Sequence, residues 1–199
     1  MTDSALTAPQ VRSTRVASLP SPGRAGMFGL IAAESAVFVI FIVAYAFYLG
    51  KSASGPTPRI LTPPLFLSVC LLSSSATLEL AMHSLKAGAP RAFRAWWLLT
   101  LVLGLTFLVG TGLEWRHLIV EEGLTISSNL FGTTFYSLVG LHAVHVTIGL
   151  LLMLAVAVFD AKKQITRARV PELSVISLYW HFVDSVWVVV FTLVYVVGR

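Results

Sequence analysis

The chain has 199 residues, of which 56% are hydrophobic and only 12% are charged. An ordinary soluble domain is about 45–50% apolar and about 25% charged, and a small soluble fold has too little interior to hide the difference. The composition therefore excludes an ordinary soluble domain and predicts a protein that is solvated by the lipid bilayer. The formal net charge of +5 does not indicate nucleic-acid binding, because the basic residues flank the apolar stretches.

Residues 1–23 are rich in Ser, Thr, Ala and Pro and lack hydrophobic periodicity, which predicts a disordered or surface-bound tail. The rest of the chain, residues 24–199, is expected to form one membrane domain. A helix needs about 20 mostly apolar residues to cross the hydrocarbon core. Stretches of that kind lie at residues 27–50, 63–86, 95–118, 131–159 and 174–197. The sequence therefore predicts an all-α integral membrane bundle of five transmembrane helices.

The Lys and Arg residues predict how this bundle is oriented. The tail and the second and fourth connections contain Arg12, Arg15, Arg24, Lys86, Arg91, Arg94, Lys162, Lys163, Arg167 and Arg169. The opposite side contains only Lys51, Arg59, Arg116 and Arg199. Because Lys and Arg concentrate in cytoplasmic loops, we expect a cytoplasmic N-terminus and an external C-terminus.

The first span contains one acidic residue, Glu34. Bulky apolar residues share its helix face, whereas small residues on the opposite face, such as Gly29 and Ala32, allow close approach of a neighbouring helix. Glu34 is expected about 10 Å along the helix from its start, at 1.5 Å per residue. Desolvation there favours the neutral carboxylic acid over the carboxylate. Glu34 is therefore the main functional candidate, as a proton-linked carboxylate.

Ionisable side chains in hydrocarbon are costly, by about 2.5–3.5 kcal/mol on insertion scales, so the others are expected to face neighbouring helices. We predict a buried polar core on four spans that consists of Glu79, Glu114, His142, His145, His181 and Asp184. Within their own helices, Glu79 is expected to pair with His83 or Lys86, and Glu114 with His117. A structural hydrogen-bonding role is the alternative to a proton or ligand role for each.

His142, His145 and His181 are also candidate ligands for a haem or a metal. A bis-His haem needs one His on each of two facing helices, across a gap that fits the cofactor. A carboxylate-bridged di-metal centre needs Glu-x-x-His on two helices, which the sequence does not provide. The lone Cys70 excludes an internal disulfide and a Cys-based metal site. We expect no metal and no catalytic residue in this chain, with a haem-binding membrane anchor as the alternative.

Two segments resemble motifs of one family. Residues 177–187, SLYWHFVDSVW, are similar to the Y-W-H-F-V-D-x-V-W motif of haem-copper oxidase subunit III. Residues 140–149, GLHAVHVTIG, resemble its G-x-H-x-x-H-V-x-x-G segment. Residues 24–48 look like the glutamate-bearing helix of that family, and residues 72–85 like its Ser/Thr-rich helix. The resemblance covers residues 24–199 in the right order.

This resemblance implies a subunit without a redox centre of its own, whose haems and copper lie in partner subunits I and II. Such a subunit packs on subunit I and supports proton uptake, oxygen access and the lifetime of the enzyme. Glu34 matches the intramembrane carboxylate that reacts with a hydrophobic carbodiimide. Arg24 matches a basic residue at the start of the same helix, where it is expected to contact a lipid headgroup, so phospholipid is an expected ligand.

Longer members of the family have two additional N-terminal helices that help to form a cleft for phospholipids. The lipid-binding roles of those two helices cannot be transferred to this chain. Five-helix members occur among bacterial cytochrome c oxidases, quinol oxidases and accessory proteins of nitric oxide reductases. The leading hypothesis is a non-catalytic oxidase subunit in the bacterial plasma membrane. An accessory subunit of a quinol oxidase or nitric oxide reductase shares every motif and stays an alternative.

Overall fold

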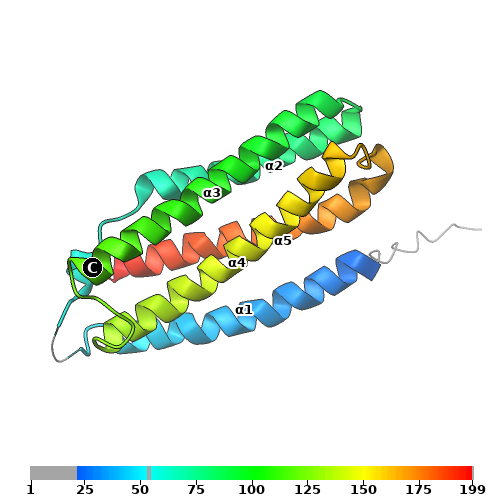
Figure 1. The fold of residues 1–199 in the computed structure, drawn as a ribbon. Coiled ribbons are helices and arrows are strands. Elements are labelled where there is room, and N and C mark those ends of the chain that lie inside the picture. Colours follow the sequence, from blue (N-terminus) through cyan, green and yellow to red (C-terminus); the bar gives the residue numbers. More distant parts are fainter. Residues whose placement is uncertain (1–21, 53–54, 199) are drawn as a thin grey trace, which may run out of the picture.

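The computed structural model describes residues 22–52 and 55–198, and this part of the chain is helical with short connections (Figure 1). The long helices are α1 (Pro22–Tyr48), α2 (Leu65–Ala87), α3 (Pro90–Val120), α4 (Leu130–Ala161) and α5 (Val170–Phe191). Helix α5 continues into a π-helical turn, η3 (Thr192–Val197). The short 3₁₀ helices η1 (Pro58–Ile60) and η2 (Arg167–Arg169) lie in the connections before α2 and α5.

Within the described residues, five helical segments are long and apolar enough to cross a membrane, which confirms the predicted all-α fold of five spans. Two helices begin five residues before the predicted span, α1 at Pro22 and α3 at Pro90. Proline favours the first turn of a helix, because its fixed φ suits the helix and its missing N–H has no partner there. The predicted tail, residues 1–23, lies almost entirely outside the described residues.

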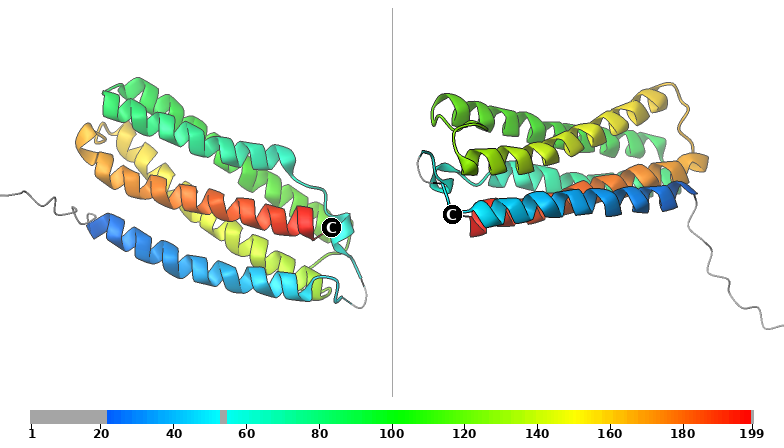
Figure 2. Two further views of the ribbon diagram at one scale, coloured as in Figure 1. Left: turned by 180° about the vertical axis from the view of Figure 1, so that it is seen from behind. Right: turned by 90° about the horizontal axis from the view of Figure 1, so that it is seen from below.

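The helices form three layers (Figures 1 and 2). Helices α2 and α3 pack most closely and make one outer layer, α4 and α5 form the middle layer, and α1 lies on the other side of them. The tight α2–α3 hairpin turns at Gly88, whose φ of 77° is left-handed and suits glycine. Helix α1 is the least covered: 6% of the residues in its apolar window are buried, against 44% in α2.

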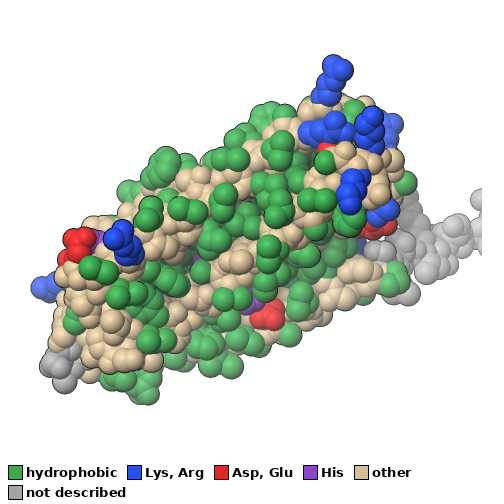
Figure 3. Space-filling view, viewed as in Figure 1, with side chains coloured by type: hydrophobic (Ala, Val, Ile, Leu, Met, Phe, Trp, Pro, Cys, Tyr) green, Lys and Arg blue, Asp and Glu red, His purple; other side chains and the backbone are tan. Residues whose placement is uncertain are grey.

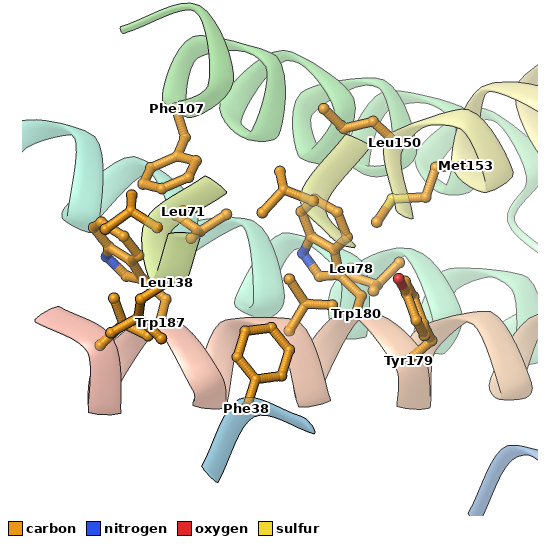
Figure 4. Close-up of a cluster of buried hydrophobic side chains, with 14 of the residues drawn as sticks. Phe38, Leu71, Leu78, Phe107, Leu138, Leu150, Met153, Tyr179, Trp180 and Trp187 are labelled. Atoms are coloured by element: carbon orange, nitrogen blue, oxygen red, sulfur yellow. The ribbon is translucent and has the colours of Figure 1, made fainter. Parts of the chain in front are cut away.

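Aromatic side chains from all layers meet in the interior, where Trp180 and Trp187 of α5 lie among side chains of the other helices (Figure 4). Their indole N–H groups donate to Ser74 Oγ at 2.8 Å and Ser68 Oγ at 3.1 Å on α2, so neither is left unsatisfied. Trp180 also needs Gly149 on α4, because a Cβ there would lie 2.6 Å from its ring. These contacts fix the register of α2, α4 and α5.

The surface shows a hydrophobic band between two charged ends (Figure 3). One end carries the α2–α3 and α4–α5 connections and the start of α1. We call it the basic end after its side chains, which are Lys86, Arg91, Arg94, Lys162, Lys163, Arg167 and Arg169. That the basic end faces the cytoplasm stays a prediction.

Candidate functional site

The first candidate group is a pair formed by Glu34 of α1 and His145 of α4. His145 Nε2 lies 3.1 Å from Glu34 Oε2, and the Phe38 ring packs 4.9 Å from the imidazole. The His145 side chain is 8% exposed and the Glu34 side chain 29%. Glu34 lies 12 residues after Pro22, about 18 Å along the helix, and therefore deeper than the sequence suggested. Red and purple side chains appear within the hydrophobic band there (Figure 3).

Hydrogen-bond geometry fixes how many protons this pair holds. His145 Nδ1 lies 2.8 Å from the backbone oxygen of Leu141, which only accepts, so Nδ1 carries a hydrogen. The contact between Nε2 and Glu34 then needs one further proton. That proton lies either on the imidazole, which gives an ion pair, or on Glu34 as a neutral acid. The pair has no net charge in either form, which suits its place in the hydrocarbon.

Helix α1 uses the opposite face from the one expected to approach a neighbour. Phe38 and Tyr45, on the same side as Glu34, are buried against the bundle. Gly29 and Ala32 are exposed, and a Cβ at Gly29 would meet nothing within 4 Å. The small face, which allows close approach of a neighbouring helix, therefore does not pack on the described helices of this chain. Packing of the aromatic face buries more apolar area and brings Glu34 to His145.

The second candidate group joins α2 and α5. His181 Nε2 lies 2.8 Å from Glu79 Oε1, and the Ser177 hydroxyl donates to the same oxygen at 3.2 Å. His181 Nδ1 lies 3.0 Å from Ser75 Oγ, and the Ser75 hydroxyl donates to Asp184 Oδ2. The four side chains of Glu79, His181, Ser75 and Asp184 therefore form a continuous hydrogen-bonded line.

Glu79 differs from the expected buried residue, because its side chain is 61% exposed. Its hydrogen-bonding partner is His181 across the helix interface rather than His83, while the charge of Lys86, the other expected partner, also attracts its carboxylate. The physical reason is a pocket of about 530 Å³ at this point. Arg24 of α1, Glu79 of α2, and Ser177 and His181 of α5 are among its lining residues, so the structure brings Arg24 and Glu79 together in one pocket.

Glu114 also differs from the expected pairing. Its carboxyl interacts with Tyr195 of the π-helical turn, whereas His117 Nδ1 lies 3.1 Å from Glu121 Oε1. Glu114 is half-buried, and its Oε1 has no hydrogen-bond partner within the part of the chain that the structure describes. His117 itself points to the surface, since its side chain is 54% exposed.

His142 is fully buried between two aromatic rings. It stacks on Trp187 at 5.1 Å between ring centroids and meets Phe107 edge-on at 5.9 Å. Neither ring nitrogen has a hydrogen-bond partner among residues 22–52 and 55–198. Since His145 and His181 each direct Nε2 at a carboxylate, the three imidazoles are not arranged as facing axial ligands. The described residues also hold no group of three or more metal-ligating side chains.

The sequence reasoning missed two partners. Ser75 is not among the candidate residues of the sequence analysis, yet it connects His181 to Asp184. Arg94 Nε donates to Asp160 Oδ2 at 2.6 Å and joins the ends of α3 and α4 at the basic end. No local signal pairs residues that are 66 or 109 positions apart. Asp160 is an isolated acidic residue close to the end of a span and has basic residues near it. That position was the one sequence signal for an ion pair at Asp160.

Comparison with known proteins identifies the family. Residues 24–199 match the family described as cytochrome c oxidase subunit III. The chain belongs to this family. It is 36% identical over 176 residues to cytochrome c oxidase subunit 3 of Alkalihalophilus pseudofirmus, covering 87% of this chain and 85% of that one. It is 35% identical over 190 residues to the protein of that name in Corynebacterium diphtheriae, covering 91% and 92%.

The subunit III protein of Bacillus subtilis is 34% identical over 176 residues, covering 87% of this chain and 85% of its own length. These relatives are named as cytochrome c oxidase subunits, which favours that interpretation over a quinol oxidase or nitric oxide reductase accessory protein. Subunit III proteins generally carry no redox cofactor of their own. Its bacterial relatives and five spanning helices place this chain in the plasma membrane as a multi-pass protein.

Proposed function

We propose that this chain is the non-catalytic subunit III of a respiratory cytochrome c oxidase in the aerobic electron transport chain. It packs on subunit I, contacts subunit II and other subunits of the complex, and supports proton uptake, oxygen access and enzyme lifetime. The haems and copper lie in the partner subunits. The observation that carries the proposal is the Glu34–His145 pair, a proton-holding group within the hydrocarbon on the least covered helix.

Glu34 is the proton-linked residue in this proposal. Its pair with His145 holds one shared proton, and its carboxyl is partly open to the membrane. A membrane-soluble carbodiimide reacts with a protonated carboxyl, which is the form that Glu34 takes when the shared proton lies on it, and the 29% exposed side chain gives the reagent access. The exposed small face of α1, with Gly29 and Ala32, allows a partner helix to approach closely.

Arg24 is the proposed contact for a lipid headgroup. It lies at the start of α1 and lines the pocket of about 530 Å³ at the basic end. A guanidinium binds phosphate with two parallel hydrogen bonds, and Phe28 in the same pocket offers an apolar surface to the lipid. His145, His181 and Asp184 hold polar contacts between the helices, Glu114 lies beside Tyr195, and His142 packs between aromatic rings. Glu79 belongs to the pocket edge.

The first experiment is purification in mild detergent through a tag on this chain, with an optical spectrum and identification of the co-purifying proteins. We expect a haem-copper catalytic subunit that carries all the haem. A haem spectrum that stays with this chain after its partners are stripped would overturn the proposal in favour of a haem-binding anchor.

The second experiment tests Glu34 in the purified complex. Glu34→Gln should abolish labelling by a hydrophobic carbodiimide and shorten the time over which the enzyme stays active during turnover, with the initial rate retained. Glu172→Gln is the matched control, because its side chain is 68% exposed at the start of α5, where it pairs with Arg169 at the basic end. An unchanged lifetime in Glu34→Gln, with the labelling lost, would contradict the proposed role of Glu34.

A further inference from the structure

The hydrogen-bonded line between α2 and α5 connects a pocket to a buried acid. At one end the Glu79 side chain is 61% exposed and lines the pocket at the basic end. At the other end Asp184 is 4% exposed, and its Oδ1 has no partner within the described residues. We propose that Glu79, His181 and Ser75 form a proton relay that loads and unloads the buried carboxyl of Asp184 from this pocket.

Each contact in the line lies within hydrogen-bonding distance. Glu79 Oε1 and His181 Nε2 are 2.8 Å apart, His181 Nδ1 and Ser75 Oγ are 3.0 Å apart, and Ser75 donates to Asp184. An imidazole accepts a proton on one nitrogen and releases one from the other, and a hydroxyl both donates and accepts. His181 and Ser75 can therefore each pass a proton along the line without a bound water.

The transfer balances without any other reactant. In the unloaded form, protonated Glu79 donates to His181 Nε2, Nδ1–H donates to Ser75, and Ser75 donates to the Asp184 carboxylate. On loading, the Glu79 O–H, Nδ1–H and Ser75 O–H bonds break, and Nε2–H, Ser75 O–H and Asp184 O–H bonds form. Asp184 becomes neutral and Glu79 becomes a carboxylate, which takes up a proton from water in the pocket. Unloading is the reverse.

The surroundings of Asp184 offer no competing route. The titratable and charged side chains on the helices packed against α5 are Arg24, Glu34, Tyr45 and Tyr48 on α1, Cys70, Glu79, His83 and Lys86 on α2, Tyr136, His142, His145 and Asp160 on α4, Arg167 and Arg169 on η2, and Tyr195 on η3. Within the described chain, Ser75 is the one side chain that hydrogen-bonds Asp184. Lys86 acts at the other end, where its charge attracts the Glu79 carboxylate.

A purely structural contact between α2 and α5 is the alternative explanation. The Ser75–Asp184 hydrogen bond alone would be enough for that role. A structural contact would not need the hydrogen bond between His181 Nδ1 and Ser75. Nor would it need the hydrogen bond between His181 Nε2 and the Glu79 carboxylate at the edge of a pocket. The relay is also separate from the Glu34–His145 pair. Nδ1 of His145 hydrogen-bonds a backbone carbonyl, so no proton can pass beyond His145.

The test is infrared spectroscopy on the whole purified complex. The carboxylic acid band of Asp184 is assigned by its loss in Asp184→Asn, and its shift after transfer to heavy water gives the rate of proton exchange. In Ser75→Ala we expect exchange at least about tenfold slower, which corresponds to about 1.4 kcal/mol of added barrier. Ser75→Thr, which keeps the hydroxyl, should restore the rate.

Ser84→Ala is the matched control on the same helix, because the Ser84 hydroxyl bonds only the Leu80 carbonyl of its own helix. It should exchange like the wild type. If Asp184→Asn fails to assemble, Glu79→Gln gives the second measurement, since the relay predicts slower exchange of an otherwise unchanged band. Exchange in Ser75→Ala or Glu79→Gln at the wild-type rate, or no band that depends on Asp184 at any working pH, would overturn the relay.

Discussion

The two His–Glu pairs of this bundle contain the same chemical groups but differ in how each histidine is held. Nδ1 of His145 hydrogen-bonds a backbone carbonyl, and its partner Glu34 lies in the middle of the least covered helix. Nδ1 of His181 hydrogen-bonds the Ser75 hydroxyl, and its partner Glu79 lines a pocket at the basic end. The first pair is locked in one tautomer, whereas the second can exchange its tautomer.

This difference shows that the hydrogen-bonding partner of Nδ1 decides whether a histidine can pass a proton on, as much as the carboxylate that contacts Nε2 does. A carbonyl only accepts, so it stops a proton at His145, while a hydroxyl can reverse its donation and passes a proton beyond His181. Exposure adds to the contrast, because the side chains of the first pair are 8% and 29% exposed and those of the second 34% and 61%.

The largest effect is expected from Gly149→Ala, which should disturb the packing of α4 on α5 beside the first pair. The new Cβ would lie 2.6 Å from the buried Trp180 ring and 3.4 Å from Tyr179, whose hydroxyl donates to the His145 carbonyl. Overpacking of this kind costs about 1–3 kcal/mol. The thermal midpoint of the purified complex should fall, while Gly112→Ala on α3, with open space at its Cβ, should not lower it. Equal midpoints for the two variants would contradict the tight α4–α5 contact.

A comparison of His145→Ala with His181→Ala comes next in size. Loss of His145 leaves Glu34 unpaired in hydrocarbon, which should cost about 1–3 kcal/mol. Loss of His181 removes a more exposed pair, which should cost about 0.2–1 kcal/mol. Thermal unfolding of the complex measures both, and Glu34→Leu together with His145→Ala should recover part of the first loss. Similar losses for the two single variants would mean that the pairs do not differ as the structure indicates.

The smallest effect is a spectroscopic one. Nitrogen NMR on the complex with labelled histidine should find Nδ1 of His145 protonated throughout the working pH range, because the Leu141 carbonyl requires it. Nδ1 of His181 should show exchange between its protonated and deprotonated forms. Assignment uses the loss of each signal in the corresponding His→Ala variant. A fixed Nδ1 in both residues would remove the distinction between them.

Much of this architecture could be predicted from the sequence, because hydrophobic length alone defines spans in a membrane. The importance of Glu34 and of the histidines on α4 and α5 followed from the cost of placing them in hydrocarbon. Their hydrogen-bonding partners on other helices could not be predicted in the same way. Helical periodicity gives the face of a side chain but not its neighbour across a helix interface, so Glu79 was assigned to its own helix instead of to His181.

The face of α1 that packs on the bundle was also missed, for a related reason. Small residues permit close packing but do not require it, and the aromatic face with Phe38 and Tyr45 gained more contact in this chain. Ser75 gave no signal of its own, since a serine on a polar stripe acquires its role only when His181 and Asp184 are brought to it from 106 and 109 positions away.

The separation between Glu34 and His145 has a consequence for biogenesis. The two residues are 111 positions apart, and at a synthesis rate of about 5–20 residues per second α1 is made on the order of 5–20 s before its partner. During that interval the insertion machinery handles a helix whose acidic residue has no imidazole to share a proton with. The unpaired carboxyl is therefore a transient cost of membrane insertion, which ends when α4 arrives and completes the pair.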